Sequence, residues 1–352
     1  MKNMQIGKHK IGKGQKTFII AEAGVNHNHK FDLAIKLVDA AANAGADAIK
    51  FQTFKAEQVA TEAGVMADYQ KKNIGKSESQ LEMLRKLEFN EDWYPKVLEY
   101  CKKRGIIFLS TPHGSFASID LLENFGVPAF KFGSGDLTSL PLLQYAAQFN
   151  KPLILGTGMA SMNEVAQAEE TIKSTGNNKI VMLHCTTNYP CPFDEVNLRA
   201  MQTMSKFLDV KTLVGYSDHT LGSQVPVMAV TLGAVMIEKH LTLDNDMEGP
   251  DHKASANPEV FKKMVDEIRK VETIMGSSQK KPLPGEIKLR PIVRRSIVAV
   301  RDIKKGEKFS LKNIDLRRPG TGMNPYLWKQ VVGKKAKTDI KIGEFLKKRT
   351  IS

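Results

Sequence analysis

The sequence predicts an α/β chain in which a (β/α)8 TIM barrel is followed by a small β-rich domain. Two observations lead to this prediction. Eight short apolar runs separated by segments of helical period fill the first 280 residues, and short β-prone pieces follow a linker. Eight strand–helix units close into a barrel whose active site collects at the carboxyl ends of the strands. Because residues capable of chemistry follow every run, the sequence predicts an enzyme.

The predicted strands alternate with helical segments in a regular order. The strands, each with the residues capable of chemistry that follow it, are Thr17–Ala21 with Glu22, Ala48–Ile49 with Lys50, Ile106–Leu109 with Ser110 and Thr111, Ala129–Phe130 with Lys131, Leu153–Leu155 with Gly156 and Thr157, Ile180–Leu183 with His184, Leu213–Val214 with Ser217 and His219, and Val235–Ile237 with Glu238 and His240.

Three helices between these strands have clear boundaries. The segment 31–44 carries apolar residues on one face and ends at Gly45. Asn90 is the expected N-cap of a helix over 91–103. Asn257 and Pro258 form the expected start of the last barrel helix, which runs to Gly276.

The connection between the second and third strands is too long for a single loop and helix. The polar segment Ala60–Ser79, with Tyr69 near its centre, leaves the predicted active-site face. Long ordered loops at such faces are commonly functional. We therefore favour a lid or a subunit contact over a disordered insertion.

The formal net charge of +14 is concentrated at the end of the chain. Residues 280–352 contain 21 Lys and Arg against 6 Asp and Glu, so the barrel is close to neutral. The basic segment is read either as a solvated surface or as a domain that serves an anionic substrate or a partner subunit. Nucleic-acid binding is disfavoured because no interleaved aromatic residues are available for base stacking.

Domain boundaries and location follow from composition. The sequence predicts a barrel over 1–279, a linker over 280–290 rich in Pro, Gly and Lys, and a β-rich domain over 291–352.

No apolar run reaches the ~20 residues of a membrane helix, and the first sixteen residues lack the apolar core of a signal peptide. Three cysteines form no disulfide framework. We expect a cytoplasmic protein without membrane contact.

Two lysines at strand ends, Lys50 and Lys131, predict an anion site. They would repel each other in one barrel mouth unless an anion such as phosphate or carboxylate lay between them. Gly133 and Gly135, on either side of Ser134, allow backbone N–H groups to approach that anion. A Schiff-base lysine, as in a barrel aldolase, is the competing interpretation.

Other strand ends supply acid–base and metal-binding groups. Glu22 can orient a substrate hydroxyl or transfer a proton. His219 and His240, on neighbouring strands, can hold a divalent metal with open coordination positions. Asp251 lies in the last βα loop, which is able to close over a substrate.

A series of ordered motifs resembles the sialic acid synthase family, which includes N-acetylneuraminate, legionaminate and pseudaminate synthases. The motifs are Ile20–His27, Lys50–Thr53, Ser110–Pro112, Gly133–Asp136, His184–Pro190, Ser217–His219 and Gly249–His252. The basic tail, with Asp302–Gly306 and Arg317–Gly320, resembles that family's antifreeze-like (SAF, β-clip) domain. The resemblance covers nearly the whole chain.

The resemblance implies condensation of phosphoenolpyruvate with an N-acylated aminohexose, such as N-acetylmannosamine, to a nine-carbon 2-keto acid and phosphate by C–O cleavage. The alternative substrate is a 6-deoxy diacetamido hexose, as for legionaminate or pseudaminate synthase. Schiff-base pyruvate aldolase chemistry is a distant alternative, and a non-enzymatic carbohydrate- or nucleic-acid-binding protein is another.

The resemblance also implies roles by motif position. His219 and His240 match metal ligands for Mn²⁺, Co²⁺ or Mg²⁺, and Arg318 matches an arginine that reaches the partner's barrel in a domain-swapped homodimer. The positions that match phosphoenolpyruvate contacts are Lys50, Thr111, Lys131, Ser134 and Ser217. The positions that match sugar-side or acid–base groups are Glu22, Gln52, Tyr189 and Asp251.

Two positions depart from the family pattern. Asp136 stands where many members have Glu, so the carboxylate is shorter by about one methylene, and Thr187 stands where some members have Asn on the phosphate side. In the expected mechanism the lysines hold the phosphate. Asp136 or Glu22 is the base that activates water.

Overall fold

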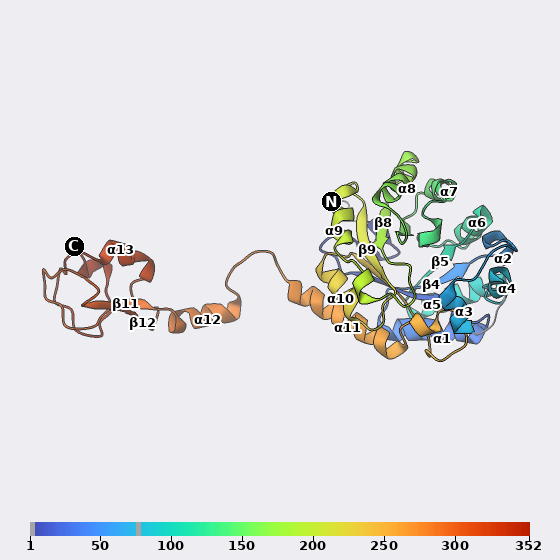
Figure 1. Cartoon of the computed structure of the whole chain (residues 1–352). Helices are drawn as coiled ribbons and strands as arrows, with labels where there is room; N and C mark the ends of the chain where they lie inside the picture. The colour runs from blue at the N-terminus through green and yellow to red at the C-terminus, as the bar shows by residue number, and fades with distance from the viewer. Residues whose placement is uncertain (1–3, 75–78) are drawn as a thin grey trace. The chain divides into compact units, whose positions relative to one another are not determined.

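A computed structural model describes residues 4–74 and 79–352 and divides the chain into two units (Figure 1). The first unit ends at Gly276 and the second begins at Ser277, close to the predicted boundary after residue 279. Each unit has its own hydrophobic core.

Eight parallel strands of the first unit form a nearly closed barrel, which confirms the predicted fold. The strand order is β5-β4-β3-β10-β9-β8-β7-β6, and the end strands β5 and β6 lie side by side. The strands are β3 (Phe18–Gly24), β4 (Ala48–Thr53), β5 (Ile107–Pro112), β6 (Phe130–Phe132), β7 (Leu153–Gly156), β8 (Ile180–His184), β9 (Leu213–Asp218) and β10 (Met236–His240).

Most strands run further than the apolar pattern predicted, so that functional residues are their last members. The run 213–214 continues to Asp218, and the run 235–237 continues to His240. The register aligns Glu22 with His240 on one side and with Lys50 on the other. Three adjacent strands therefore present these side chains at one level of the barrel.

The helices surround the barrel, and the first and the last of them begin and end where the sequence indicated (Figure 1). Gly45 ends the first helix in a left-handed conformation with φ 85°, which favours glycine. The helices of the βα units are α1 (Phe31–Ala44), α5 (Tyr94–Arg104), α6 (Phe116–Asn124), α7 (Leu140–Gln148), α8 (Met162–Ser174), α9 (Ala200–Phe207), α10 (Gln224–Thr231) and α11 (Pro258–Met275).

Side-chain caps fix two of these boundaries. The Asn257 side chain accepts a hydrogen bond from the N–H of Val260, as predicted for the start of α11. Asn90 caps the one-turn helix η1 (Glu91–Trp93), and α5 follows it, so the predicted helix over 91–103 is divided into two.

The long connection between β4 and β5 contains three short helices, α2 (Ala56–Val59), α3 (Asp68–Ile74) and α4 (Gln80–Arg85). The segment packs on a small core of its own, made by Val25, Phe54, Met66, Met83 and Leu87. It is therefore not a disordered insertion over 60–74. Residues 75–78 of the predicted lid lie outside the described residues.

An N-terminal hairpin, which the sequence did not lead us to expect, closes the amino end of the barrel. It consists of β1 (Met4–Ile6) and β2 (His9–Ile11). Ile6 and Ile11 are fully buried in one cluster with residues of the barrel interior such as Ile20. The hairpin therefore extends the apolar interior of the barrel at this end.

The second unit is a small domain with short β segments, in line with the predicted β-rich domain. A two-stranded antiparallel pair, β11 (Ser296–Ala299) with β12 (Ile314–Arg317), packs on a core that includes Ile303 and Phe309. Helix α12 (Pro284–Val293) occupies most of the predicted linker 280–290, and a short helix α13 (Trp328–Val331) follows later. No helix in the described parts of either unit is long and apolar enough to cross a membrane.

The remaining one-turn helices lie in loops of both units. They are η2 (Ser134–Asp136), η3 (Phe193–Glu195), η4 (His252–Ala254), η5 (Pro325–Leu327) and η6 (Lys348–Thr350).

Candidate active site

A cavity of about 260 Å³ opens at the carboxyl ends of the barrel strands. It brings together most of the side chains singled out in the sequence. Those that line it are Glu22, Lys50, Gln52, Thr111, Lys131, Ser134, Thr187, Tyr189, Ser217, His219, His240 and Asp251. The two site residues that do not line it are Asp136 and Arg318.

The floor of the cavity holds two buried lysines, each paired with a carboxylate. Lys50 Nζ lies 2.5 Å from Glu22 Oε2 and donates to Thr111 Oγ1 at 2.7 Å. Lys131 Nζ lies 3.0 Å from Glu238 Oε1, and Lys50 lies 4.0 Å from the same carboxylate. The repulsion that the sequence suggested between the lysines is thus balanced by Glu22 and Glu238.

The two carboxylates differ in their affinity for a proton. Burial raises the pKa of Glu22 more than Lys50 lowers it. Burial alone would also raise the pKa of Glu238, but Lys131 and Lys50 outweigh burial and lower that pKa to about 2. Glu238 is therefore the permanent counter-ion, whereas Glu22 is the member of the cluster that binds a proton more readily.

Loops after β6 and β7 form a close-packed wall next to the lysines. The N–H of Gly158 donates to Ser134 Oγ at 3.0 Å, and that oxygen lies 3.1 Å from Cys185 Sγ. A Cβ added at Gly156 would lie 2.9 Å from Ser134 Oγ, so only glycine fits. Small residues and backbone N–H groups at this wall are suited to bind an anion.

His219 and His240 lie on adjacent strand ends, with ring centroids 5.6 Å apart. His219 Nδ1 bonds to the carbonyl of Thr186 at 2.7 Å, which leaves Nε2 available as an acceptor. The Nδ1 atom of His240 is buried without a hydrogen-bond partner among the described residues. Burial lowers the pKa of both histidines, so each is a neutral imidazole at pH 7.

This pair fits the divalent metal that the sequence suggested. Neutral imidazoles with free ring nitrogens are the donors that such metals accept. Within residues 4–74 and 79–352 no group of three or more His, Cys, Asp and Glu side chains is arranged to hold an ion. A metal held by the two histidines would therefore keep several positions for substrate and water.

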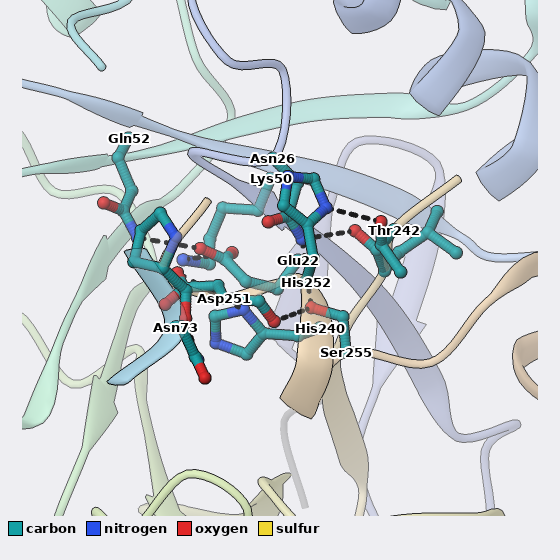
Figure 2. Close-up of polar contacts among 12 residues, drawn as sticks. Glu22, Asn26, Lys50, Gln52, Asn73, His240, Thr242, Asp251, His252 and Ser255 are labelled. Carbon is teal, nitrogen blue, oxygen red and sulfur yellow. Dashed lines mark hydrogen bonds and ion pairs between the residues drawn. The ribbon is translucent and has the colours of Figure 1, made fainter. Parts of the chain in front are cut away.

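The outer part of the cavity combines polar and apolar groups. Gln52 Nε2 donates to Glu22 Oε1 at 3.2 Å, and Asp251 Oδ2 lies 4.0 Å from His240 Nδ1 (Figure 2). Burial, with the nearby charge of Glu22, raises the pKa of Asp251 to about 7. Asp251 can therefore exist in either protonation state at neutral pH.

The loop that carries Asp251 is anchored to the loop that follows β3, the first strand of the barrel. Asn26 Nδ2 donates to Ser255 Oγ at 3.0 Å, and Ser255 Oγ donates to the carbonyl of Asp251 at 2.7 Å (Figure 2). Asn73, from the inserted helix α3, donates to the carbonyl of Pro250 at 2.7 Å. The loop is thus fixed from two directions.

Aromatic rings connect the insertion to the histidines. Tyr69 of α3 stacks on Tyr189, with centroids 5.0 Å apart, and Tyr189 lies 4.1 Å from the ring of His219. Met83, Leu84 and Leu87, which belong to α4 or follow it, complete an apolar wall. The insertion therefore contributes one side of the cavity.

Two predicted residues lie elsewhere. Asp136 is in η2 and does not line the cavity, and its carboxylate Oδ2 is 3.2 Å from His113 Nδ1. Arg318 is exposed in the second unit, directly after β12.

Sequence reasoning assigned no role to several residues of the site. Glu238 was noted only as a residue at the end of a strand. His113 directly follows the motif 110–112. The sequence therefore indicated both positions as neighbours of the site. The contribution of Met83, Leu84 and Leu87 had no signal in the sequence.

Comparisons with known proteins agree with this architecture. A model of the NeuB family matches residues 37–280, and a SAF domain model matches residues 294–351. The N,N'-diacetyllegionaminic acid synthases of Legionella pneumophila and Campylobacter jejuni are each 45% identical to the chain. The matches cover 95% of this chain in both cases, and 94% and 99% of those proteins.

A solved structure is also similar to most of this chain. The N-acetylneuraminic acid synthetase of Leptospira borgpetersenii, in complex with citrate, is 31% identical with a TM-score of 0.72. The match covers 82% of this chain and 94% of that one.

Proposed function

The chain belongs to the NeuB family, and we propose that it condenses phosphoenolpyruvate with an N-acylated aminohexose. The products are a nine-carbon 2-keto acid and phosphate. The observation that carries this proposal is the pair of buried lysines, Lys50 and Lys131, at the floor of the cavity. The same cavity holds the imidazoles of His219 and His240, each with a ring nitrogen available to a ligand.

The floor of the cavity suits phosphoenolpyruvate. This substrate carries a phosphate and a carboxylate, and both need cationic or N–H partners when they leave water. Lys50 can exchange Glu22 for the substrate because Glu22 accepts a proton more readily than Glu238. Ser134, Thr111 and Ser217 are hydroxyl donors on the same surface.

The reaction joins the enol carbon of phosphoenolpyruvate to the aldehyde carbon of the open sugar. Positive character then develops at the second carbon, water adds there, and phosphate leaves by C–O cleavage. Lys50 and Lys131 stabilise the charge of the departing phosphate. Asp251, with its pKa near 7, can donate a proton to the aldehyde oxygen as that oxygen becomes a hydroxyl.

A divalent metal, Mn²⁺, Co²⁺ or Mg²⁺, held by His219 and His240, supplies Lewis-acid polarisation of the sugar aldehyde when bound. Tyr189 packs against His219 and restricts the orientation of that imidazole. The carbonyl of Thr186 accepts from Nδ1 of His219 and fixes the tautomer of that imidazole.

For the sugar, we propose a 6-deoxy diacetamido hexose, which would make the product N,N'-diacetyllegionaminate. Two observations support it: the 45% identity to two synthases of that name, and the apolar wall of Met83, Leu84 and Leu87. A methyl at carbon six or an acetamido methyl packs on such a wall, whereas a hydroxyl would lose hydrogen bonds with water there.

N-acetylmannosamine is the second candidate, because the similar structure from Leptospira borgpetersenii is an N-acetylneuraminic acid synthetase.

The carboxylates around Lys131 disfavour the Schiff-base alternative. Burial lowers the pKa of Lys131, but Glu238 and Glu22 outweigh burial and raise it, so its amine is protonated and not nucleophilic.

We further propose that Arg318 completes the cavity of a second copy in a domain-swapped homodimer. The motif position of Arg318 and the basic character of its domain support this assignment. A guanidinium placed there would pair with an anionic group of the substrate.

Phosphate release from phosphoenolpyruvate, measured across a panel of N-acylated aminohexoses, tests the proposed reaction and the sugar. We expect the rate of phosphate release to depend on the sugar and to be highest with the 6-deoxy diacetamido hexose. Fastest release with N-acetylmannosamine would support the second candidate. Trapping of the chain by borohydride and pyruvate without phosphate release would instead establish the aldolase alternative.

A further inference from the structure

His113 is a cavity residue that neither the motifs nor the proposed mechanism uses. It follows the last residue of β5, and its N–H donates to the carbonyl of Thr53 at 3.0 Å. Its imidazole lines the cavity beside Gly133, where an added Cβ would approach the ring to 3.4 Å. The imidazole therefore lies at the anion-binding wall, on a backbone fixed by the barrel.

The carboxylate of Asp136 contacts this imidazole. Its Oδ2 atom lies 3.2 Å from His113 Nδ1, and Asp136 itself does not line the cavity. The carboxylate at position 136 is one methylene shorter than the Glu that the family resemblance led us to expect. Of these two side chains, His113 and not the shorter carboxylate lines the cavity.

The contact determines which nitrogen of His113 can act as a base. A carboxylate that accepts from Nδ1–H stabilises the tautomer in which Nε2 carries a lone pair. No residue in the described part of the chain bonds to Nε2. The arrangement of carboxylate, imidazole and open cavity is that of an oriented general base.

We propose that His113, oriented by Asp136, removes a proton from the water that adds to the second carbon of phosphoenolpyruvate. This inference rests on the proposed function. As the water oxygen bonds to that carbon, one water proton passes to Nε2 of His113. Phosphate later leaves with the electron pair of its C–O bond, and the imidazolium returns this proton to it. The second water proton, released as the ketone forms, balances the proton taken up by the aldehyde oxygen.

Glu22, the other candidate base, is less suited to this step. Its carboxylate is held by Lys50 at 2.5 Å and by Gln52 at 3.2 Å. Removing a proton from water would compete with both contacts. His113 lines the cavity and has a ring nitrogen without a partner among the described residues, whereas its partner Asp136 does not line the cavity.

The test compares His113→Gln, Asp136→Asn and the double variant, with phosphate release at saturating sugar as the assay. Loss of a general base lowers kcat by about 10²-fold or more. The KM for phosphoenolpyruvate should stay within about threefold, because the base acts on water and not on the bound substrate. The double variant should be no slower than the slower single variant, because both residues serve one step.

His184→Gln is the matched control. His184 also lies at a strand end, but its Nε2 bonds to the carbonyl of Val196 and it does not line the cavity. Its kcat should remain within about threefold of the wild-type value.

A rescue separates chemistry from folding. In His113→Ala the longer carboxylate of an added Asp136→Glu substitution can reach the cavity, and we expect at least about tenfold recovery of kcat over His113→Ala alone. Phosphoenolpyruvate binding, measured by calorimetry, verifies that each variant retains its site. Should His113→Gln not fold, Asp136→Asn and the rescue pair give the same comparison.

Two failures are distinguishable. A wild-type chain that releases no phosphate with any aminohexose would remove the proposed function. The role of His113 would be overturned if the wild-type enzyme works but its His113→Gln and Asp136→Asn variants keep the wild-type kcat. It would also be overturned if the rescue pair shows no recovery.

Discussion

The ammonium of Lys131 lies 3.0 Å from the carboxylate of Glu238, and both side chains are almost completely buried. A buried ion pair of this kind contributes little net stability, but removing one partner leaves an uncompensated charge. The pair joins β6 to β10 across the barrel. It therefore links the anion-binding floor to the strand that carries His240.

The first prediction concerns this pair. Lys131→Met leaves Glu238 with the more distant ammonium of Lys50 and a hydrogen bond from Ser217. We expect the barrel to lose about 3 kcal/mol of stability. The double variant Lys131→Met with Glu238→Gln should recover more than half of that loss, because the unpaired charge is gone. Calorimetric unfolding of the three proteins measures both effects. A single variant that unfolds at the wild-type temperature would contradict the assignment.

The second prediction concerns the metal. Because two histidines are the only ligands we assign, binding should be weak and reversible. Exhaustive EDTA treatment should abolish phosphate release, and Mn²⁺, Co²⁺ or Mg²⁺ should restore it. The EPR spectrum of added Mn²⁺ should report binding to the wild-type chain and not to His240→Ala. Full activity after chelation, or unchanged Mn²⁺ binding by His240→Ala, would remove the metal site.

The third prediction concerns the second unit. Arg318→Ala and Glu22→Gln should each be nearly inactive alone. In a mixed dimer, the chain with intact Glu22 meets the intact Arg318 of the other chain, so one site per heterodimer should regain activity. Two different affinity tags allow the heterodimer to be isolated. No recovery in an isolated heterodimer would contradict the domain-swapped arrangement.

The fourth prediction concerns pH and His27, which packs against Phe51, Phe89 and Trp93. Burial, with a smaller effect of His29, lowers the pKa of His27 to about 3. The unfolded chain binds this proton near pH 6.5, so below that pH it binds more protons than the folded chain. The free energy of unfolding should therefore fall as the pH drops from about 6.5 towards 3, by up to about 1.4 kcal/mol per pH unit.

Urea unfolding of the wild type and of His27→Phe at several pH values tests this expectation. The variant keeps a ring in the cluster but has no titrating group, so its stability should depend less steeply on pH. His29→Gln, which alters an exposed residue nearby, is the control. Equal pH dependence in the wild type and His27→Phe would contradict the assignment.

The barrel was predictable because its signals are local. Apolar runs give the strands, and caps such as Asn257 and Gly45 give the helix boundaries. The hairpin β1–β2 was not predictable, because two strands of three residues leave no period to detect. Helix α12 was missed because it contains Pro291 and buries none of its residues.

The site was predictable as a set of residues but not as a set of contacts. The strand ends indicated Lys50 and Lys131, but an intervening substrate anion was the only partner considered. The structure pairs them with Glu22 and Glu238, which come from other strands. That His113 lines the cavity and Asp136 does not likewise depends on the position of a loop, which sequence spacing does not fix.

The central claim is that Lys50 and Lys131 hold a phosphate that leaves by cleavage of its bond to carbon. Phosphoenolpyruvate labelled with ¹⁸O at the bridging position tests this claim most directly. The account predicts that the label appears in inorganic phosphate and not in the keto acid. It also predicts that Lys131→Ala slows the release by roughly 10²-fold or more. Label retained in the keto acid would establish P–O cleavage and would contradict the mechanism.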